Sequence, residues 1–202
     1  MEFLTFRQSF SLYIDGAAVE MVPSVRYLGV HLTDTLTWRT NTTAVTKKAN
    51  QRLYFLRKLR RAGLHTDILR SFYSCVVEST LTTCLTVWYA GCTVAEKEAL
   101  QRVVKSAQRT IGCSLPPISD IYTTRCRERA TCILRDPTHP AHGLFTPLPS
   151  GRRLRCIQVK TSRLKNSFYP DAVRLLNSST PHILNILSTQ STILDTTGTL
   201  SL

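Results

Sequence analysis

The spacing of apolar residues between positions 41 and 63 predicts a long amphipathic helix. Apolar side chains recur there every three or four residues, so they share one stripe that faces a core. The stripe consists of Val45, Ala49, Leu53, Leu56 and Leu59. Glycine is common just past a helix end, so we expect the helix to end at Gly63. The candidate residues for its N-terminal cap are Asn41, Thr42 and Thr43.

The same pattern predicts two further helices before position 113. The second runs from about Thr66 to Tyr89, and we expect its Trp88 to close the core. Thr93 and Glu96 have the spacing of a capping box, so a third helix starts there and ends at Gly112. Three helices in series predict a small bundle.

Proline and glycine divide the rest of the chain. After Pro116-Pro117, Ser119 is expected to cap a fourth helix that runs to about Arg135. The next segment, DPTHPAHGLFTPLPSGRRLR, is dense in proline and glycine and predicts a loop with fixed turns. Pro170 fits the first position of a short helix, and the Ser/Thr-rich residues from 178 predict a loose tail.

Alternating residues near the start of the chain predict β structure. Residues 11–32 contain three short runs, SLYI, AAVEMV and VRYLGVHL, which we interpret as strands, with Asp15-Gly16 as a hairpin turn. The expected fold is α+β and mostly helical, with a small N-terminal antiparallel β element, a helical bundle and a basic, loop-rich C-terminal segment. The expected divisions are residues 1–40, 41–112, 113–177 and 178–202.

Charge points to a polyanionic partner. The chain has 26 Lys+Arg against 13 Asp+Glu, a formal net charge of +13, and no acid between Asn41 and Thr66. Basic surfaces of this kind bind nucleic acid through its phosphates without reading sequence, so we expect RNA, DNA or a hybrid and no small-molecule substrate. The residues expected to contact phosphates are Lys47, Lys48, Arg52, Arg57, Lys58 and Arg61, with Arg152, Arg153 and Arg155 in support.

The cysteines and the most apolar segment indicate the expected cellular location of the protein. Seven cysteines are an odd number and follow no secretory signal, which favours a reducing compartment. The segment LTTCLTVWYAGC is too short and too rich in threonine to cross a bilayer. We therefore expect an intracellular protein, nuclear or cytoplasmic, that is not secreted and has no membrane span.

A series of short motifs lies in order between Ser11 and Ser178. In chain order they are VRYLGV after the DG turn, LTW, KKANQRLYFLRKLR, TVWYAGC, ALQRVVKSAQRTIG, DIYTTRC, DPTHPAHGLF, LPSGRRLR and RLKNSFYPDAVRLLN. In this order they closely resemble the C-terminal part of the reverse transcriptases of LINE-type, non-LTR retrotransposons. The ordered set is specific, whereas each motif alone is weak.

This resemblance implies a polymerase thumb. In that family the first hairpin grips the primer at the edge of the palm, and the following helices clamp the template–primer duplex. By this resemblance Tyr27, Leu28 and Gly29 occupy the primer-grip position. A glycine there lets the backbone approach a nucleic-acid strand closely. Without the family, the same segment would be interpreted as an ordinary buried strand.

The chemistry of that family is missing from the chain. Reverse transcription requires carboxylates that hold two metal ions, and the family carries an adjacent aspartate pair upstream of the matched region. No two acidic residues are adjacent here. We therefore expect no catalytic residue, metal or cofactor and no enzyme activity of the chain alone. The N-terminal MEFLTFRQSF is interpreted as a join to a lost palm in a truncated or host-retained element, and an inert remnant is an open alternative.

A second resemblance belongs to a different class of protein. The segment around KKANQRLYFLRKLR resembles the N-terminal region described for the AlkB homologue 8 alkylated-DNA-repair family. His65-Thr66-Asp67 also matches the start of the iron site of 2-oxoglutarate dioxygenases, two histidines and one carboxylate. The resemblance implies a dioxygenase or methyltransferase-associated module as the alternative function. At a helix start, however, Asp67 is interpreted as a first-turn acid.

Two smaller groups of residues have both a functional and a structural interpretation. Cys126, Cys132, His139 and His142 are close in sequence, but their spacing is poor for zinc, so buried cysteines and turn histidines are preferred. Most aromatic residues fall on apolar stripes and are expected in the core. Tyr54, beside basic neighbours on the first helix, is the one whose exposure would indicate base stacking.

Overall fold

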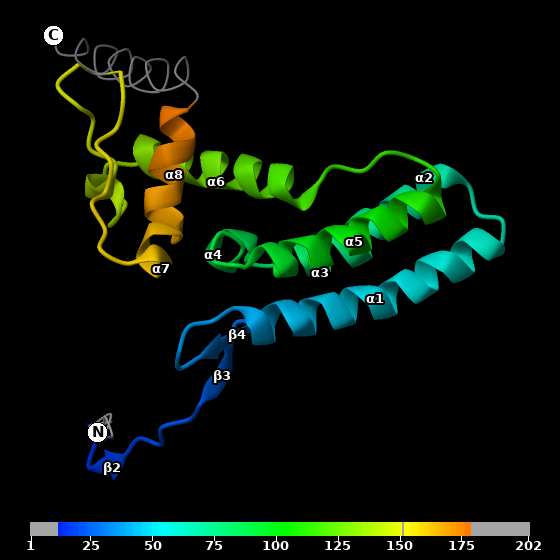
Figure 1. Ribbon diagram of the computed structural model, residues 1–202, viewed down its shortest axis with the longest axis horizontal. Helices are drawn as coiled ribbons and strands as arrows, with labels where there is room; N and C mark the ends of the chain where they lie inside the picture. The colour runs from blue at the N-terminus through cyan, green and yellow to red at the C-terminus, as the bar shows by residue number, and fades with distance from the viewer. Residues whose placement is uncertain (1–11, 151, 179–202) are drawn as a thin grey trace, which may run out of the picture.

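The computed structural model describes residues 12–150 and 152–178, and in this range the chain is mostly helical with small antiparallel hairpins at its start (Figure 1). The expected α+β class is confirmed. The predicted Ser/Thr-rich tail and the MEFLTFRQSF join lie outside the described residues, apart from Ser178. In chain order the elements are β1 (Tyr13–Ile14), β2 (Ala17–Ala18), β3 (Ser24–Tyr27), β4 (Val30–Thr33), α1 (Arg39–Arg61), α2 (Thr66–Phe72), the π-helix η1 (Tyr73–Glu78), α3 (Ser79–Leu81), α4 (Leu85–Trp88), α5 (Val94–Ile111), α6 (Ile118–Arg135), the 3-10 helix η2 (His142–Leu144), α7 (Ser162–Lys165) and α8 (Phe168–Asn177).

The β structure consists of two separate hairpins, β1–β2 and β3–β4. The run VRYLGVHL was predicted as one strand, and this prediction is wrong, because the chain reverses at Leu28 and Gly29. Both residues have positive φ, +47° and +85°. Two consecutive residues of positive φ make the tight turn that matches the twist of paired strands. Tyr27 therefore pairs with Val30 across the turn.

Helix α1 starts earlier than its predicted caps. It begins at Arg39, and none of the three candidates caps it, since Asn41 and Thr42 are buried within its first turn. The Asn41 Oδ1 instead accepts a hydrogen bond of 3.1 Å from the backbone N–H of His31, which ties α1 to β4. The predicted apolar stripe is confirmed in its centre, where Ala49, Leu53 and Leu56 are fully buried. Gly63 follows the helix with a φ of +77°.

The helix predicted from Thr66 to Tyr89 is divided into four pieces. A π-helical turn, η1, follows α2, and the chain breaks again at Cys84, which adopts a left-handed φ of +49°. The break is supported from another element, because the Arg125 guanidinium on α6 donates to the Thr82 carbonyl at 2.8 Å. Hydrogen bonds from a distant arginine are not visible in local apolar spacing, so the pattern predicted one continuous helix. Trp88 is fully buried, as predicted.

The starts of the later helices test the cap predictions. The capping box of Thr93 and Glu96 is confirmed at the start of α5. Ser119 does not cap α6, which begins at Ile118 behind Pro117, a residue with no side-chain donor or acceptor. Pro170 is the third residue of α8 rather than the first. A proline is tolerated there because its missing N–H falls among the unpaired groups of a first turn.

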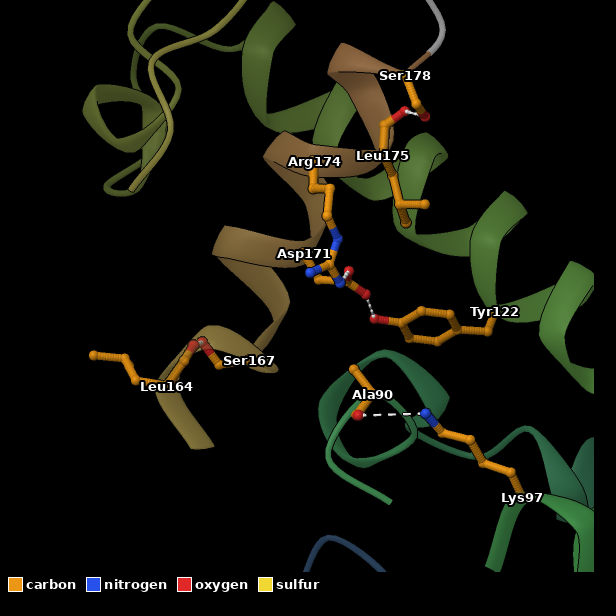
Figure 2. Close-up of polar contacts among 9 residues, drawn as sticks. All are labelled: Ala90, Lys97, Tyr122, Leu164, Ser167, Asp171, Arg174, Leu175 and Ser178. Carbon is orange, nitrogen blue, oxygen red and sulfur yellow. Dashed lines mark hydrogen bonds and ion pairs between the residues drawn. The ribbon is translucent and has the colours of Figure 1, made fainter. Parts of the chain in front are cut away.

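Two hydrophobic clusters meet on α6. The larger lies among α1, the α2–α4 segment, α5 and the first half of α6. The smaller joins the second half of α6 to the loop around Phe145 and Leu154 and to α8. At the junction, the Tyr122 hydroxyl on α6 donates a hydrogen bond to the Asp171 carboxylate on α8, and Arg174 pairs with the same carboxylate (Figure 2). The aromatic ring of Phe168 packs against both clusters.

Candidate nucleic-acid interface

One face of α1 is basic, aromatic and open to solvent. The residues of this face are spaced four, three, four and three apart, so they lie one above another on the helix opposite its buried stripe. All of them are exposed, and we call them the α1 face: Lys47, Gln51, Tyr54, Lys58 and Arg61. Lys48 is exposed beside it. Four predicted phosphate contacts therefore lie where a polyanion can reach them.

Two of the arginines on α1 that were predicted to contact phosphates form hydrogen bonds within the protein. The half-buried Arg52 donates to the Val76 carbonyl in the π-helical turn at 2.6 Å and also bonds the Thr80 hydroxyl in α3. Arg57 donates to the Ser106 hydroxyl on α5 at 3.0 Å, although its side chain remains exposed. The structure thus gives Arg52 an internal role that charge patterning did not indicate.

The three supporting arginines predicted from the sequence lie on a loop far from the α1 face. Arg152, Arg153 and Arg155 are exposed, while Leu154 between them is fully buried and bonds Asn177 through its backbone N–H at 2.8 Å. This loop lies at the end of the molecule formed by α6 and α8, away from the C-terminal half of α1 (Figure 1). The structure does not bring these three arginines together with the α1 face.

The segment around α7 reaches α1 and forms a cleft with it. The cleft has a volume of about 1480 Å³ and lies between the start of α1, the turn before it, the start of α5 and the α7 segment. The Arg163 guanidinium donates to the Thr35 carbonyl at 3.3 Å and so joins two sides of the cleft. Arg39 and Lys47 supply further positive charge.

Hydroxyl and amide groups supply most of the polar lining. Thr43, Asn50 and Ser162 are examples from two of the segments. The only acid among the described lining residues is Glu96, whose carboxylate accepts bonds from the Thr93 backbone N–H (2.7 Å) and from the Thr93 and Thr42 hydroxyls (2.9 and 3.3 Å). Arg39, Lys47 and Arg163 outnumber this one acid, so the lining has a net positive charge as well as many hydrogen-bond donors, which suits a phosphate ester.

Sequence reasoning missed most of this cleft. It treated Thr42 and Thr43 as helix caps and left Thr35, Arg39 and Asn50 without a role. The signal present was the density of threonine between positions 33 and 46. That signal was insufficient because the opposite wall, from 161 to 167, is more than a hundred residues away along the chain.

The primer-grip-like residues lie at the tip of the β3–β4 hairpin. Tyr27 is 64% exposed and Leu28 77% exposed, and no atom outside its neighbours lies within 4 Å of a Cβ built on Gly29. The interpretation as an ordinary buried strand is therefore wrong for this segment. The open tip leaves the backbone at Gly29 accessible to solvent.

The candidate metal ligands are held in local contacts. The Nδ1 of His139 accepts from the Ala141 backbone N–H at 3.1 Å, and the His142 Nδ1 lies 3.2 Å from the Ile133 carbonyl. Cys126 is buried while Cys132 is exposed on the same helix. Within residues 12–150 and 152–178, no three His, Cys, Asp or Glu side chains are grouped so that they could hold a metal ion.

His65 and Asp67 lie at the start of α2. His65 is the N-cap and accepts from the Asp67 backbone N–H, and the two side chains are 77% and 80% exposed. Asp67 occupies the first turn, where a carboxylate interacts favourably with the helix dipole. This is the interpretation of Asp67 that the sequence favoured.

Several groups in the core have shifted pKa values. Burial raises the pKa of the Tyr73 and Tyr122 hydroxyls, and it raises the pKa of the Cys92 thiol to about 12 and of the Cys126 thiol to about 11. Such shifts keep these groups neutral.

Comparison with known proteins shows a family similarity over part of the chain. Residues 38–79 match the family described as alkylated DNA repair protein alkB homolog 8, N-terminal. The matched segment contains α1, α2 and η1, and thus the whole α1 face. No curated protein and no solved structure matches the chain. No helix in the described part of the chain is both long and apolar enough to cross a membrane.

Proposed function

We propose that the chain is a nucleic-acid-binding module that contacts phosphates without sequence preference through the α1 face and Lys48. The observation that carries this proposal is an exposed row of three cations, Lys47, Lys58 and Arg61, in a segment with no acid between Asn41 and Thr66. The resemblance of the ordered motifs to a LINE-type reverse transcriptase thumb supports it and suggests a template–primer duplex as the ligand. Without the catalytic aspartates, binding is the activity proposed for this chain.

Salt dependence tests the proposal directly. The chain is titrated against a labelled RNA–DNA hybrid and a DNA duplex at several salt concentrations, and log affinity is plotted against log salt. Phosphate contacts release counterions, so affinity falls steeply with salt, and each lost contact lowers the slope by about 1. The double variant Lys47→Glu, Lys48→Glu is expected to weaken binding to both ligands.

A matched control separates the α1 face from net charge. Lys105 and Arg109 are exposed on α5, so Lys105→Glu with Arg109→Glu changes the total charge equally. We expect this control to retain more affinity than the α1 variant. Equal losses would show that total charge, not this surface, governs binding, and unchanged affinity in the Lys47, Lys48 variant would disprove the assignment.

A second candidate function, an accessory module of AlkB-homologue type, is favoured by the family match over residues 38–79. The matched description concerns the N-terminal part of such proteins. Within the match, His65 and Asp67 supply only two candidate iron ligands, and both are at the surface. Iron binding with 2-oxoglutarate turnover that is lost in His65→Ala would favour a dioxygenase. Absence of both, with intact binding to nucleic acid, would favour the binding module.

A further inference from the structure

Tyr54 lies exposed in the middle of a row of cations. Its side chain is 53% exposed, on α1 between Lys47 and Arg61. The Lys58 ammonium lies 5.5 Å from the centre of the ring, and the ring of Phe55, itself 56% exposed, meets it edge-on at 5.6 Å. Large aromatic residues are usually buried, so an exposed aromatic pair flanked by cations is a surface suited to a ligand that has both flat rings and negative charge.

The cleft continues this surface toward the start of the helix. Lys47 belongs to both, since it lines the cleft and is the first residue of the α1 face. Asn50, also in the cleft lining, lies four residues, or about one turn, before Tyr54. A chain of alternating phosphates and rings can therefore run from Arg163 and Arg39 past Lys47 and reach Tyr54 without leaving the basic surface.

We infer that the cleft and Tyr54 together bind unpaired nucleotides of a single strand, with cleft cations and hydroxyls holding its sugar-phosphate backbone and the Tyr54 ring stacking one of its bases. The inference rests on the proposed function and narrows its ligand. In a duplex the flat faces of the interior bases are covered by their neighbours, so an interior base must be unpaired to stack on Tyr54. Stacking tolerates any base, which agrees with binding that does not read sequence.

The test compares a labelled short oligothymidylate with a blunt duplex, using the full chain. Tyr54→Ala is expected to lower affinity for the single strand about tenfold while leaving the duplex affinity within about twofold. Tyr54→Phe keeps the ring and is expected to retain single-strand affinity. Tyr13→Ala removes a tyrosine of similar exposure, 63%, on β1 and serves as the control. Arg163→Glu tests the cleft independently and should also weaken the single strand more than the duplex.

A base analogue reports stacking itself. 2-Aminopurine within the oligonucleotide is expected to be quenched by the wild type and Tyr54→Phe but not by Tyr54→Ala. Equal affinities of wild type, Tyr54→Ala and Arg163→Glu for the single strand would overturn the inference, even if salt-dependent duplex binding persists. Polyglutamate of matched charge serves as a competitor without bases. If it displaces the strand equally well from the wild type and from Tyr54→Ala, the inference is also overturned, because charge alone would then account for binding. Failure of the wild type to bind any nucleic acid would instead disprove the proposed function.

Discussion

The hydroxyl of Tyr122 donates a hydrogen bond to the carboxylate of Asp171, although the two residues are 49 positions apart in the chain. Tyr122 is 6% exposed and Asp171 4% exposed, so the bond lies in the interior between α6 and α8. Arg174 on the next turn of α8 pairs with the other carboxylate oxygen (Figure 2). A buried carboxylate is tolerated only when its oxygens are bonded in this way. The contact thus fixes α8 to the helical body.

Removing the hydroxyl in Tyr122→Phe is expected to lower the free energy of unfolding by about 1–3 kcal/mol, because it leaves a buried carboxylate oxygen without its donor. Urea denaturation followed by circular dichroism measures the change. Tyr54→Phe removes a hydroxyl from an exposed ring and should change stability by no more than about 0.5 kcal/mol. A similarly small effect at Tyr122 would contradict the assigned role of the bond.

Gly91→Ala is expected to destabilise the fold through a clash with Trp38. A Cβ at position 91 would lie 2.6 Å from the indole Nε1 and 2.8 Å from Cδ1, so the ring must move. Overpacking of this kind costs about 1–3 kcal/mol. Gly143→Ala, where nothing lies within 4 Å of the added Cβ, is the matched control. Thermal unfolding compares the two, and equal midpoints would show that Trp38 is free to shift.

Arg52→Met should affect stability more than binding, unlike Lys58→Met. Arg52 bonds the Val76 carbonyl and the Thr80 hydroxyl, so its loss removes two charge-assisted hydrogen bonds at a cost of about 1–3 kcal/mol, although the Val76 carbonyl still accepts from the Thr80 hydroxyl at 2.8 Å. Lys58 is exposed on the α1 face, so its loss should mainly reduce nucleic-acid affinity and the salt slope. Urea titration and the binding assay, applied to both variants, check this division. The reverse pattern would place Arg52 among the phosphate contacts.

The cysteines are expected to divide by reactivity under native conditions. Cys75, Cys84, Cys132 and Cys156 are exposed, whereas Cys92 and Cys126 are buried with raised pKa values. The thiolate is the reactive form, so iodoacetamide at mildly alkaline pH should label the exposed group first. Mass spectrometry after short exposure identifies the labelled residues. Denaturant should remove the difference, and early labelling of Cys126 would contradict the packing of α6.

Stability should decrease in alkaline solution. The pKa of Cys92 is raised from 9.0 to about 12 and that of Cys126 from 9.0 to about 11. The unfolded chain therefore loses these protons first, and between pH 9 and 11 the folded state binds more protons than the unfolded state. Under that condition the free energy of unfolding falls as pH rises. Urea midpoints at several pH values measure the decline, which Cys92→Ala should make shallower; an equal decline would exclude this thiol as a cause.

Local sequence was sufficient to predict the features that depend only on neighbouring residues in the chain. The buried centre of α1, the Thr93–Glu96 box, the glycine after α1 and the basic character of the exposed α1 positions all follow from spacing within a few residues. It failed at the second helix, because the π-helical turn and the break at Cys84 accompany contacts from Arg52 and Arg125. Those arginines lie on α1 and α6, so the apolar spacing of the second helix carries no information about their contacts with it.

The sequence by itself determined the charge of the surface, the helical class and which side of α1 is buried, since these depend on composition and on periodicity. Only the tertiary structure decided which basic residues share a surface. It directs Arg52 inward, places Arg152, Arg153 and Arg155 at the α6–α8 end, and carries Arg163 to the start of α1 to form the cleft. The reason is physical: a charge pattern is fixed by the order of residues, but the meeting of segments more than a hundred residues apart is fixed by the packing of their apolar faces.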